Sequence, residues 1–413
     1  MNVLVVLEQR YLRTPDGAIW STSTGASSFW QRYRDVFDSV RVVARVADVT
    51  AAKPSWLRAD GPGVSFAAVP TYVGPREYLF HRGAVHKAVR EAFVPGDAVI
   101  LRVGSVLADA LLPRLSESHY PYAVEVVSDP WDVFSPGAVH HPLRPLFRRW
   151  FAHRLRIQCL GARAAAYVTD AALQRRYPPG PGILSCGCSD VDLPREAFVD
   201  FSRPQRKPGI PATILTVGTL EQLYKAPDVL IDAVGLAVRE GLDLRLVMVG
   251  DGRYRPSLEE RAERQGLSGK VRFVGWLPAG AAVRRELDQS DLFILPSRQE
   301  GLPRAMIEAM ARALPCIGST VGGIPELLPR EDLVDPNDAR ALADMIREVI
   351  THPARMEAMS SQNLRKAADY REDVLAARRR SFYREVRDLT RAAAGVAKKP
   401  MATPDVIGSG ASS

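Results

Sequence analysis

Two glutamates separated by seven residues occupy a stretch with the pattern of a strand, a loop and a helix. The apolar run 292–295 predicts a buried strand, and apolar residues recur at helical spacing after Pro303. Glu300 then falls in the loop and Glu308 inside the helix. The first N–H groups of such a helix form an anion site, whereas carboxylates suit neutral hydroxyl groups. This chemistry fits a ligand with phosphate in its middle and hydroxyls at both ends, as in a nucleotide sugar. The alternative is an ordinary loop glutamate and a solvated helix glutamate.

Parallel strands joined by helices must position these residues. In the first half of the chain, apolar runs alternate with helical patterns. The apolar runs lie at 40–46, 98–103 and 122–127, and the predicted helices lie at 76–93 and 105–116. In the second half, further apolar runs lie at 213–218, 244–250 and 270–277. This alternation predicts an α/β fold with parallel sheets covered by helices. No G-x-G-x-x-G follows the first strand of either half, which argues against an NAD-dependent oxidoreductase.

The segment EGLPRAMIEAMARALPCIGSTVGGIPELL resembles the donor-site signature of retaining GT-B glycosyltransferases of family 4, the glycosyl transferases group 1. The resemblance extends more weakly over residues 1–390. It implies two Rossmann-like parallel-sheet domains facing a central cleft. It also implies a hexosyltransferase-type enzyme (EC 2.4) that transfers sugar from a nucleoside diphosphate, with retention and without a metal.

The resemblance also assigns roles in the donor site. It implies that Lys225 and Glu300 are catalytic residues. Lys225 would bind the donor diphosphate, and Glu300 would orient sugar hydroxyls. Glu308 would bind the ribose. Thr219 stands where family members often have an arginine. The remaining donor-binding candidates are turn, base-wall and helix-entry residues: Gly218, Thr219, Gly250, Val274, Gly275, Trp276, Gly301, Leu302 and Pro303.

In the first half, two short stretches resemble the acceptor side of the same family. Gly25 and Ala26 resemble the loop after strand one, although an N-cap turn explains them equally well. Ser128 and Asp129 follow the strand 122–127, where family members often carry His-Asp. Asp129 is a catalytic candidate facing the acceptor, and its alternative is a turn-capping aspartate.

Composition divides the 413 residues into predicted domains. We expect an acceptor-binding domain at 1–200, a Pro-rich basic linker at 201–212 and a donor-binding domain at 213–371. A charged helix at 372–394 would cross back to the first domain, and the tail 395–413 would be disordered.

Charge and cysteine usage limit the partners and the compartment. The net charge is +8, but no zinc-finger spacing or long Lys/Arg block is present, so we expect no nucleic acid partner. Four scattered cysteines fit a reducing cytoplasm. The apolar run 1–7 ends at Glu8 and Arg10, which predicts a first strand and not a signal peptide or membrane span.

Residues 140–156 combine arginine, histidine and aromatic residues in a helical pattern. This composition is typical of an interfacial membrane helix, but we favour an ordinary arginine-rich helix whose aromatic residues pack on the sheet. Peripheral contact of 140–156 with the anionic inner face of the plasma membrane is the alternative hypothesis. Asp190-Val191-Asp192 formally matches a metal-binding D-x-D, but its surroundings resemble a family 4 turn, so we expect no metal.

We therefore predict a bacterial glycosyltransferase, and the abundance of arginine and alanine suggests a GC-rich genome. No cofactor is expected beyond the donor, for which UDP or GDP is the expected nucleotide. The acceptor hydroxyl could belong to a polysaccharide, a lipid-linked glycan or a small metabolite. A GT-B nucleotide-sugar epimerase and a non-catalytic nucleotide-sugar-binding protein are the alternatives.

Overall fold

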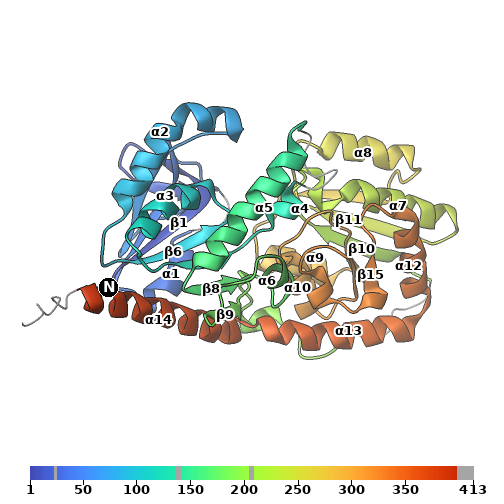
Figure 1. Cartoon of the computed structure of the whole chain (residues 1–413). Helices are drawn as coiled ribbons and strands as arrows, with labels where there is room; N and C mark the ends of the chain where they lie inside the picture. The colour runs from blue at the N-terminus through green and yellow to red at the C-terminus, as the bar shows by residue number, and fades with distance from the viewer. Residues whose placement is uncertain (23–25, 135–140, 204–208, 398–413) are drawn as a thin grey trace, which may run out of the picture. The chain divides into compact units, whose positions relative to one another are not determined.

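The apolar runs of the sequence form the strands of two sheets in a computed structural model that describes residues 1–22, 26–134, 141–203 and 209–397. Figure 1 shows the course of the chain. The chain divides into two units, the first comprising Met1–Ile100, Ala110–Ala123 and the chain from Tyr383 onward. The second comprises Leu101–Asp109 and Val124–Phe382. The predicted domain limits at 200 and 213 remain a prediction.

The first unit is organised around three parallel strands, with Val3 of β1 opposite Val40 of β3 and Val40 opposite Val64 of β5. Two short strands, β2 and β4, extend this unit in antiparallel pairs. Aromatic side chains of α1 supply part of the core, because Trp30 and Tyr33 are fully buried. The elements are β1 Val3–Arg13, β2 Ile19–Ser21, α1 Ser27–Arg34, β3 Val40–Asp48, β4 Leu57–Arg58, β5 Val64–Pro70 and α2 Gly74–Ala92.

Strand β1 is longer than the apolar run 1–7 that predicted it, since it continues through Glu8 and Arg10 to Arg13. The predicted first strand is therefore present, and it continues past the end of the apolar run because the charge of Glu8 is compensated within the unit. Arg45 Nε lies 3.4 Å from the Glu8 carboxylate, and the Tyr72 hydroxyl donates to the same group. A paired charge can therefore occupy a position where an apolar pattern stops.

The residues of β6 and α3 are divided between the two units. The same sheet continues from β6 with β7, β8 and β9 in that spatial order. The predicted helix 140–156 begins and ends later than expected, at Arg144–Gly161. The elements are β6 Ala98–Val103, α3 Val106–Glu117, β7 Ala123–Val126, α4 Pro130–Val133, α5 Arg144–Gly161, β8 Ala164–Tyr167, α6 Ala172–Arg176, β9 Leu184–Gly187 and η1 Arg195–Ala197.

The second sheet lies wholly in the second unit and has six parallel strands in the order β12-β11-β10-β13-β14-β15. The chain reverses its direction of travel across the sheet between β10 and β13, which are neighbours. Parallel doubly wound sheets bind ligands at the carboxyl ends of the strands at such a switch point. The strands are β10 Ala212–Val217, β11 Leu244–Val249, β12 Val271–Gly275, β13 Leu292–Leu295, β14 Cys316–Ser319 and β15 Leu333–Val334.

Helices cover this sheet, and one core includes Leu292 and Ile294 of β13 together with side chains of α7, α8 and α12. Because side chains alternate along a strand, Phe293 and Leu295 point to the opposite face. No helix among the described residues is both long and apolar enough to cross a bilayer. The remaining elements are η2 Leu223–Lys225, α7 Pro227–Arg239, α8 Arg255–Arg264, α9 Ala281–Asp288, α10 Arg304–Ala311, α11 Ile324–Leu327, η3 Arg330–Asp332, α12 Ala339–Thr351, α13 Pro353–Ala367, η4 Ala368–Tyr370 and α14 Glu372–Ala397.

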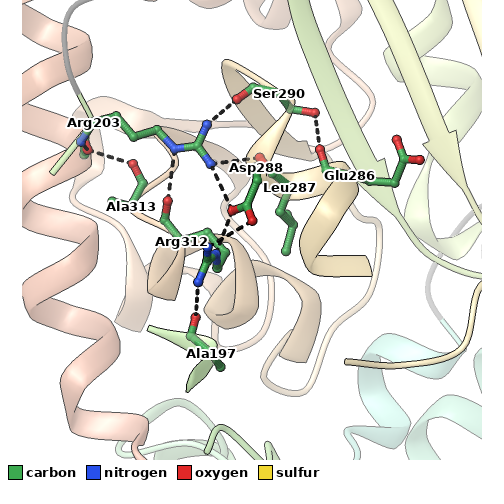
Figure 2. A network of polar contacts seen from close by, with 9 residues as sticks. Ala197, Arg203, Glu286, Leu287, Asp288, Ser290, Arg312 and Ala313 are labelled. Atoms are coloured by element: carbon green, nitrogen blue, oxygen red, sulfur yellow. Dashed lines mark hydrogen bonds and ion pairs between the residues drawn. The ribbon is translucent and has the colours of Figure 1, made fainter. Parts of the chain in front are cut away.

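Arg203, in the predicted linker, is held firmly by this half of the chain (Figure 2). Its guanidinium donates to the carbonyl oxygens of Arg312 at 3.0 Å and Leu287 at 2.8 Å, and also to that of Ser290. These carbonyls lie at or just beyond the ends of α10 and α9, where backbone oxygens lack intrahelical donors. A cation at these ends also meets the negative end of each helix dipole.

Candidate nucleotide-sugar site

The two loops at the switch point carry the two predicted catalytic residues of the second sheet. Strand β10 leads to Lys225, and β13 leads to Glu300. The strands are in register as neighbours, with Ile214 opposite Leu292. The sheet order therefore brings together two residues that are 75 positions apart in sequence.

Lys225 and Glu300 form a direct ion pair, in which the lysine Nζ donates to Glu300 Oε1 at 2.5 Å. The hydroxyl of Ser297 donates to the same oxygen at 2.8 Å. Glu300 is only 7% exposed. Two donors therefore fix Oε1. Within the described residues Glu300 is the hydrogen-bond partner recorded for the ammonium, which has two further N–H groups for a ligand anion.

Arg298 joins the two loops, and the sequence reasoning missed it. Its guanidinium makes a bidentate ion pair with Asp228 of α7, at 2.8 and 2.7 Å, and donates to the Leu223 carbonyl at 2.6 Å. The Arg298 N–H also donates to the carbonyl of Tyr224 at 2.7 Å. The segment immediately before Lys225 is therefore fastened to the segment immediately before Glu300. In sequence, Arg298 lies just after β13 and Asp228 at the start of α7, so their pairing depends on β10 and β13 being neighbours.

Helix α10 begins at Arg304, directly after the predicted entry residues Gly301, Leu302 and Pro303. Its N-cap residue, Pro303, makes no side-chain capping hydrogen bond to the described residues. Its first N–H groups are therefore suited to an anion, and their part in a donor site remains a prediction. Arg304 itself is exposed and adds a cation at this end of the helix.

Glu308 lies one turn into α10 and is not a fully solvated helix residue. Burial raises the pKa of its carboxyl above the ordinary value, and the charges of Arg304 and Arg284 oppose that rise. A carboxylate that has lost part of its hydration gains more from hydroxyl donors supplied by a ligand.

The other donor-site candidates lie where β10, β11 and β12 end. Gly218 N–H donates to the Val249 carbonyl at 2.9 Å, and Gly250 N–H donates to the Gly275 carbonyl at 2.8 Å. Gly250 has φ of +139°, and a Cβ there would lie 1.8 Å from the Gly218 carbonyl oxygen, so only glycine fits. These hydrogen bonds place Gly218, Gly250 and Gly275 together.

Around these glycines, Thr219 is exposed, and its hydroxyl accepts from the Glu221 N–H at 3.1 Å. Val274 is half-buried in β12. Trp276 follows that strand and is 69% exposed, which leaves a large aromatic face open to a planar partner such as a base.

The Glu300 loop rests on a second loop. Gly323 N–H donates to the Gly301 carbonyl at 2.7 Å, and the Ser319 hydroxyl donates to the Ser297 carbonyl at 2.6 Å. Gly322 has φ of +55°, and a Cβ there would lie 2.0 Å from the Glu300 carbonyl oxygen. The backbone that carries Glu300 is thus supported from β14 and the turn after it.

Asp129 is 3% exposed and is fully engaged by neighbouring groups. One carboxylate oxygen accepts from Trp131 N–H at 2.8 Å and from the Tyr177 hydroxyl, and the other accepts from Arg176. It is the N-cap of α4, which is the turn-capping alternative raised by its sequence. Its catalytic role remains a prediction.

Close by, Asp132 shares the Arg176 guanidinium, with 3.1 Å between the two groups. Burial, with the Asp129 charge as the next contribution, raises the pKa of Asp132 to about 6. Ser128 is half-buried, and Ala26 is the residue before α1, whereas Gly25 lies outside the described residues.

The first carboxylate of the D-x-D stretch, Asp190, is engaged in an ion pair within the protein. Arg102 donates to Asp190 at 2.6 Å and to Glu125 at 2.5 Å, forming a chain of three charges. Within the described residues, no group of three or more His, Cys, Asp or Glu is arranged to hold a metal ion.

Comparison with known proteins gives independent information on the chain. Residues 211–352 match the family model for glycosyl transferases group 1. Protein CapJ of Staphylococcus aureus is 26% identical over 342 residues, which are 83% of this chain and 85% of CapJ. The amylovoran biosynthesis glycosyltransferase AmsK of Erwinia amylovora is 30% identical over 174 residues, or 37% of this chain and 42% of AmsK. The match to AmsK thus spans less than half of either chain.

Among solved structures, HepE of Anabaena in complex with UDP and glucose is similar over nearly its whole length. The TM-score is 0.59 at 17% identity, and the match covers 96% of this chain and 99% of HepE. At this identity the likeness concerns the fold, and it agrees with the architecture expected from the sequence.

Proposed function

We propose that this chain, whose residues 211–352 match the model for glycosyl transferases group 1 and whose fold is GT-B, is a retaining, family 4 enzyme that moves a hexose from UDP to a glycan hydroxyl. The observation that carries this proposal is the Lys225–Glu300 pair at the switch point of the second sheet. In the proposal, the cation would bind the diphosphate and the neighbouring carboxylate would accept hydrogen bonds from sugar hydroxyls.

The positions of these groups match the charges that the reaction creates. Cleavage of the sugar–phosphate bond leaves new negative charge on UDP, and fixed donors near that charge lower the barrier. Lys225 and the first N–H groups of α10 would bind the diphosphate. Glu300 would accept hydrogen bonds from sugar hydroxyls next to the same phosphate, and Glu308 would accept them from the ribose.

In this proposal the leaving phosphate oxygen takes the acceptor proton, so no separate general base is assigned. Lys225, Arg304 and the α10 amides supply positive charge to the leaving group, and no metal is assigned. Trp276 has an exposed ring, and it would pack against the nucleotide base together with Val274 and Gly275.

The nucleotide and the acceptor rest on similarity. HepE is described in complex with UDP, and AmsK is named for amylovoran biosynthesis. We therefore assign UDP as the nucleotide and a bacterial polysaccharide or lipid-linked glycan as the acceptor. The same proposal places donor binding in 213–371 and acceptor binding in 1–200.

Substitution of Lys225 tests the assignment. Lys225→Ala should lower UDP affinity in calorimetry and reduce sugar transfer by about 100-fold or more, as expected on removal of a group that meets developing charge. Lys270→Ala is the matched control, because Lys270 pairs with Asp243 on the surface, 3.1 Å away. Near-normal transfer by Lys225→Ala would remove this lysine from the diphosphate site. Consumption of UDP-hexose without an acceptor, giving an isomeric donor, would instead identify an epimerase.

A further inference from the structure

The outward side of α5 carries an apolar stripe that the proposed sugar transfer does not use. Five large apolar residues on it are 37 to 60% exposed: Leu143, Leu146, Trp150, Ile157 and Leu160. With exposed His153 they follow one another at spacings of 3, 4, 3, 4 and 3 residues. That spacing keeps all six on one narrow side of a helix, over about 26 Å of its length.

The opposite side of α5 is already occupied, because Leu155, Gln158 and Cys159 are buried. The outward stripe is therefore not the packing surface of the helix. Water-exposed apolar side chains in such a continuous arrangement mark a surface that meets another apolar phase.

A row of arginines identifies the kind of partner. Arg149 and Arg156 border the stripe at a spacing of seven residues, and Arg163 continues the spacing just beyond the helix. All three are exposed, and residues 143–163 contain no aspartate or glutamate. Within the described part of the chain, Arg149 and Arg163 form no ion pair. Their charges are thus free to meet an external anion.

We propose that this side of α5 docks the enzyme on an anionic lipid bilayer, with the apolar stripe at the headgroup boundary and the arginines on lipid phosphates. Helices with one apolar side, tryptophan and a basic border bind in the plane of such interfaces. A second copy of the chain fits this surface less well. Pairing two such stripes would bring two arginine rows together without any acidic partner from α5.

Vesicle sedimentation of the full chain tests the proposal without depending on sugar transfer. The protein should sediment with vesicles of phosphatidylcholine and phosphatidylglycerol at low salt, and should bind vesicles of phosphatidylcholine alone much more weakly. Arg149→Gln combined with Arg163→Gln should lower the partition coefficient by about 25-fold, because each arginine contributes a factor of about five near an anionic surface.

Trp150→Glu and Leu146→Glu should each abolish binding, since a carboxylate then enters the apolar stripe. Phe201→Glu is the matched control, because Phe201 is 83% exposed in the same unit but lies outside α5, and this variant should bind like the parent. Thermal melting of each variant checks that it is folded.

Three outcomes would overturn the proposal: no sedimentation of the parent protein with anionic vesicles, equal binding to neutral vesicles, or equal binding by Trp150→Glu and Phe201→Glu. Light scattering that shows a dimer, dissociated by Trp150→Glu, would assign the stripe to a second copy instead. If binding persists while Lys225→Ala leaves transfer intact, docking stands and the proposed donor site fails.

Discussion

The ion pair between Arg298 and Asp228 should control how Lys225 presents its charge. Asp228→Asn keeps the size of the side chain but removes the charge that holds the guanidinium in two hydrogen bonds. The same guanidinium holds the Leu223 carbonyl, two residues before Lys225. Loosening Arg298 should therefore let the Lys225 loop move relative to Glu300.

The size of the effect follows from the burial of the pair. The Arg298 and Asp228 side chains are 10 and 17% exposed. Removing one partner of a fully buried pair costs about 3–5 kcal/mol, and we expect about 2–3 kcal/mol for this nearly buried pair. A displacement of about 1 Å in a binding group can reduce catalysis about 100-fold. We therefore expect UDP affinity to fall by about tenfold or more.

The same helix provides a matched control. Arg261 makes a bidentate pair with Asp232, which lies one turn beyond Asp228 on α7 and is not bonded to either loop of the switch point. Its side chains are 37 and 22% exposed, so Asp232→Asn should cost only about 1 kcal/mol. UDP affinity should stay near the parent value in this variant.

Calorimetry with UDP and denaturant unfolding of the same samples separate positioning from stability. The expected result is a loss of affinity in Asp228→Asn but not in Asp232→Asn, at temperatures where both are folded. Parent-like UDP binding by Asp228→Asn would refute the reasoning. An equal loss of affinity in both variants would show that only the general stability of α7 matters.

Three further substitutions have defined outcomes. Burial raises the pKa of Glu308. As pH decreases, UDP affinity should therefore begin to fall at a higher pH than it would with an ordinary glutamate. Glu308→Gln should bind UDP more weakly at neutral pH, and calorimetry should show no decrease of its affinity from protonation of this side chain. Asp132, whose pKa is raised to about 6, stabilises the fold below its ordinary pKa and loses this contribution as pH rises to about 6. Asp132→Asn should thus gain up to about 2 kcal/mol over the parent at neutral pH and nothing near pH 4, as measured by urea unfolding. Arg203→Ala leaves three carbonyl oxygens without their charged donor, and should lower the free energy of unfolding by about 3 kcal/mol, whereas a loss below 1 kcal/mol would mean that water replaces the guanidinium.

Most of the second sheet could be predicted from the sequence, because each of its main strands is a short apolar run bounded by glycine, proline or polar residues. The strand 292–295 and a helix beginning after Pro303 were both confirmed. Parallel strands that are buried on both faces give this clear signal. Strand β5 was missed, since its burial pattern is mixed and it has few fully buried residues.

The contacts of the site were harder to predict than its residues. Lys225 and Glu300 were assigned to different parts of the donor, yet the structure pairs them directly. The Arg298–Asp228 pair joins residues 70 positions apart. Such contacts depend on which strands are neighbours, and strand order is not encoded in local periodicity. These two contacts could therefore be identified only once the order of the strands in the sheet was known.

The close backbone approach at Gly250 and Gly322 restricts how this scaffold can diversify. Neither position can gain even one carbon atom without striking a carbonyl group of the opposing loop. A library made to alter donor preference should therefore leave both glycines untouched. Mutagenesis is better concentrated on outward-facing neighbours such as Thr219 and Trp276, where new side chains can be accommodated without distorting the turns.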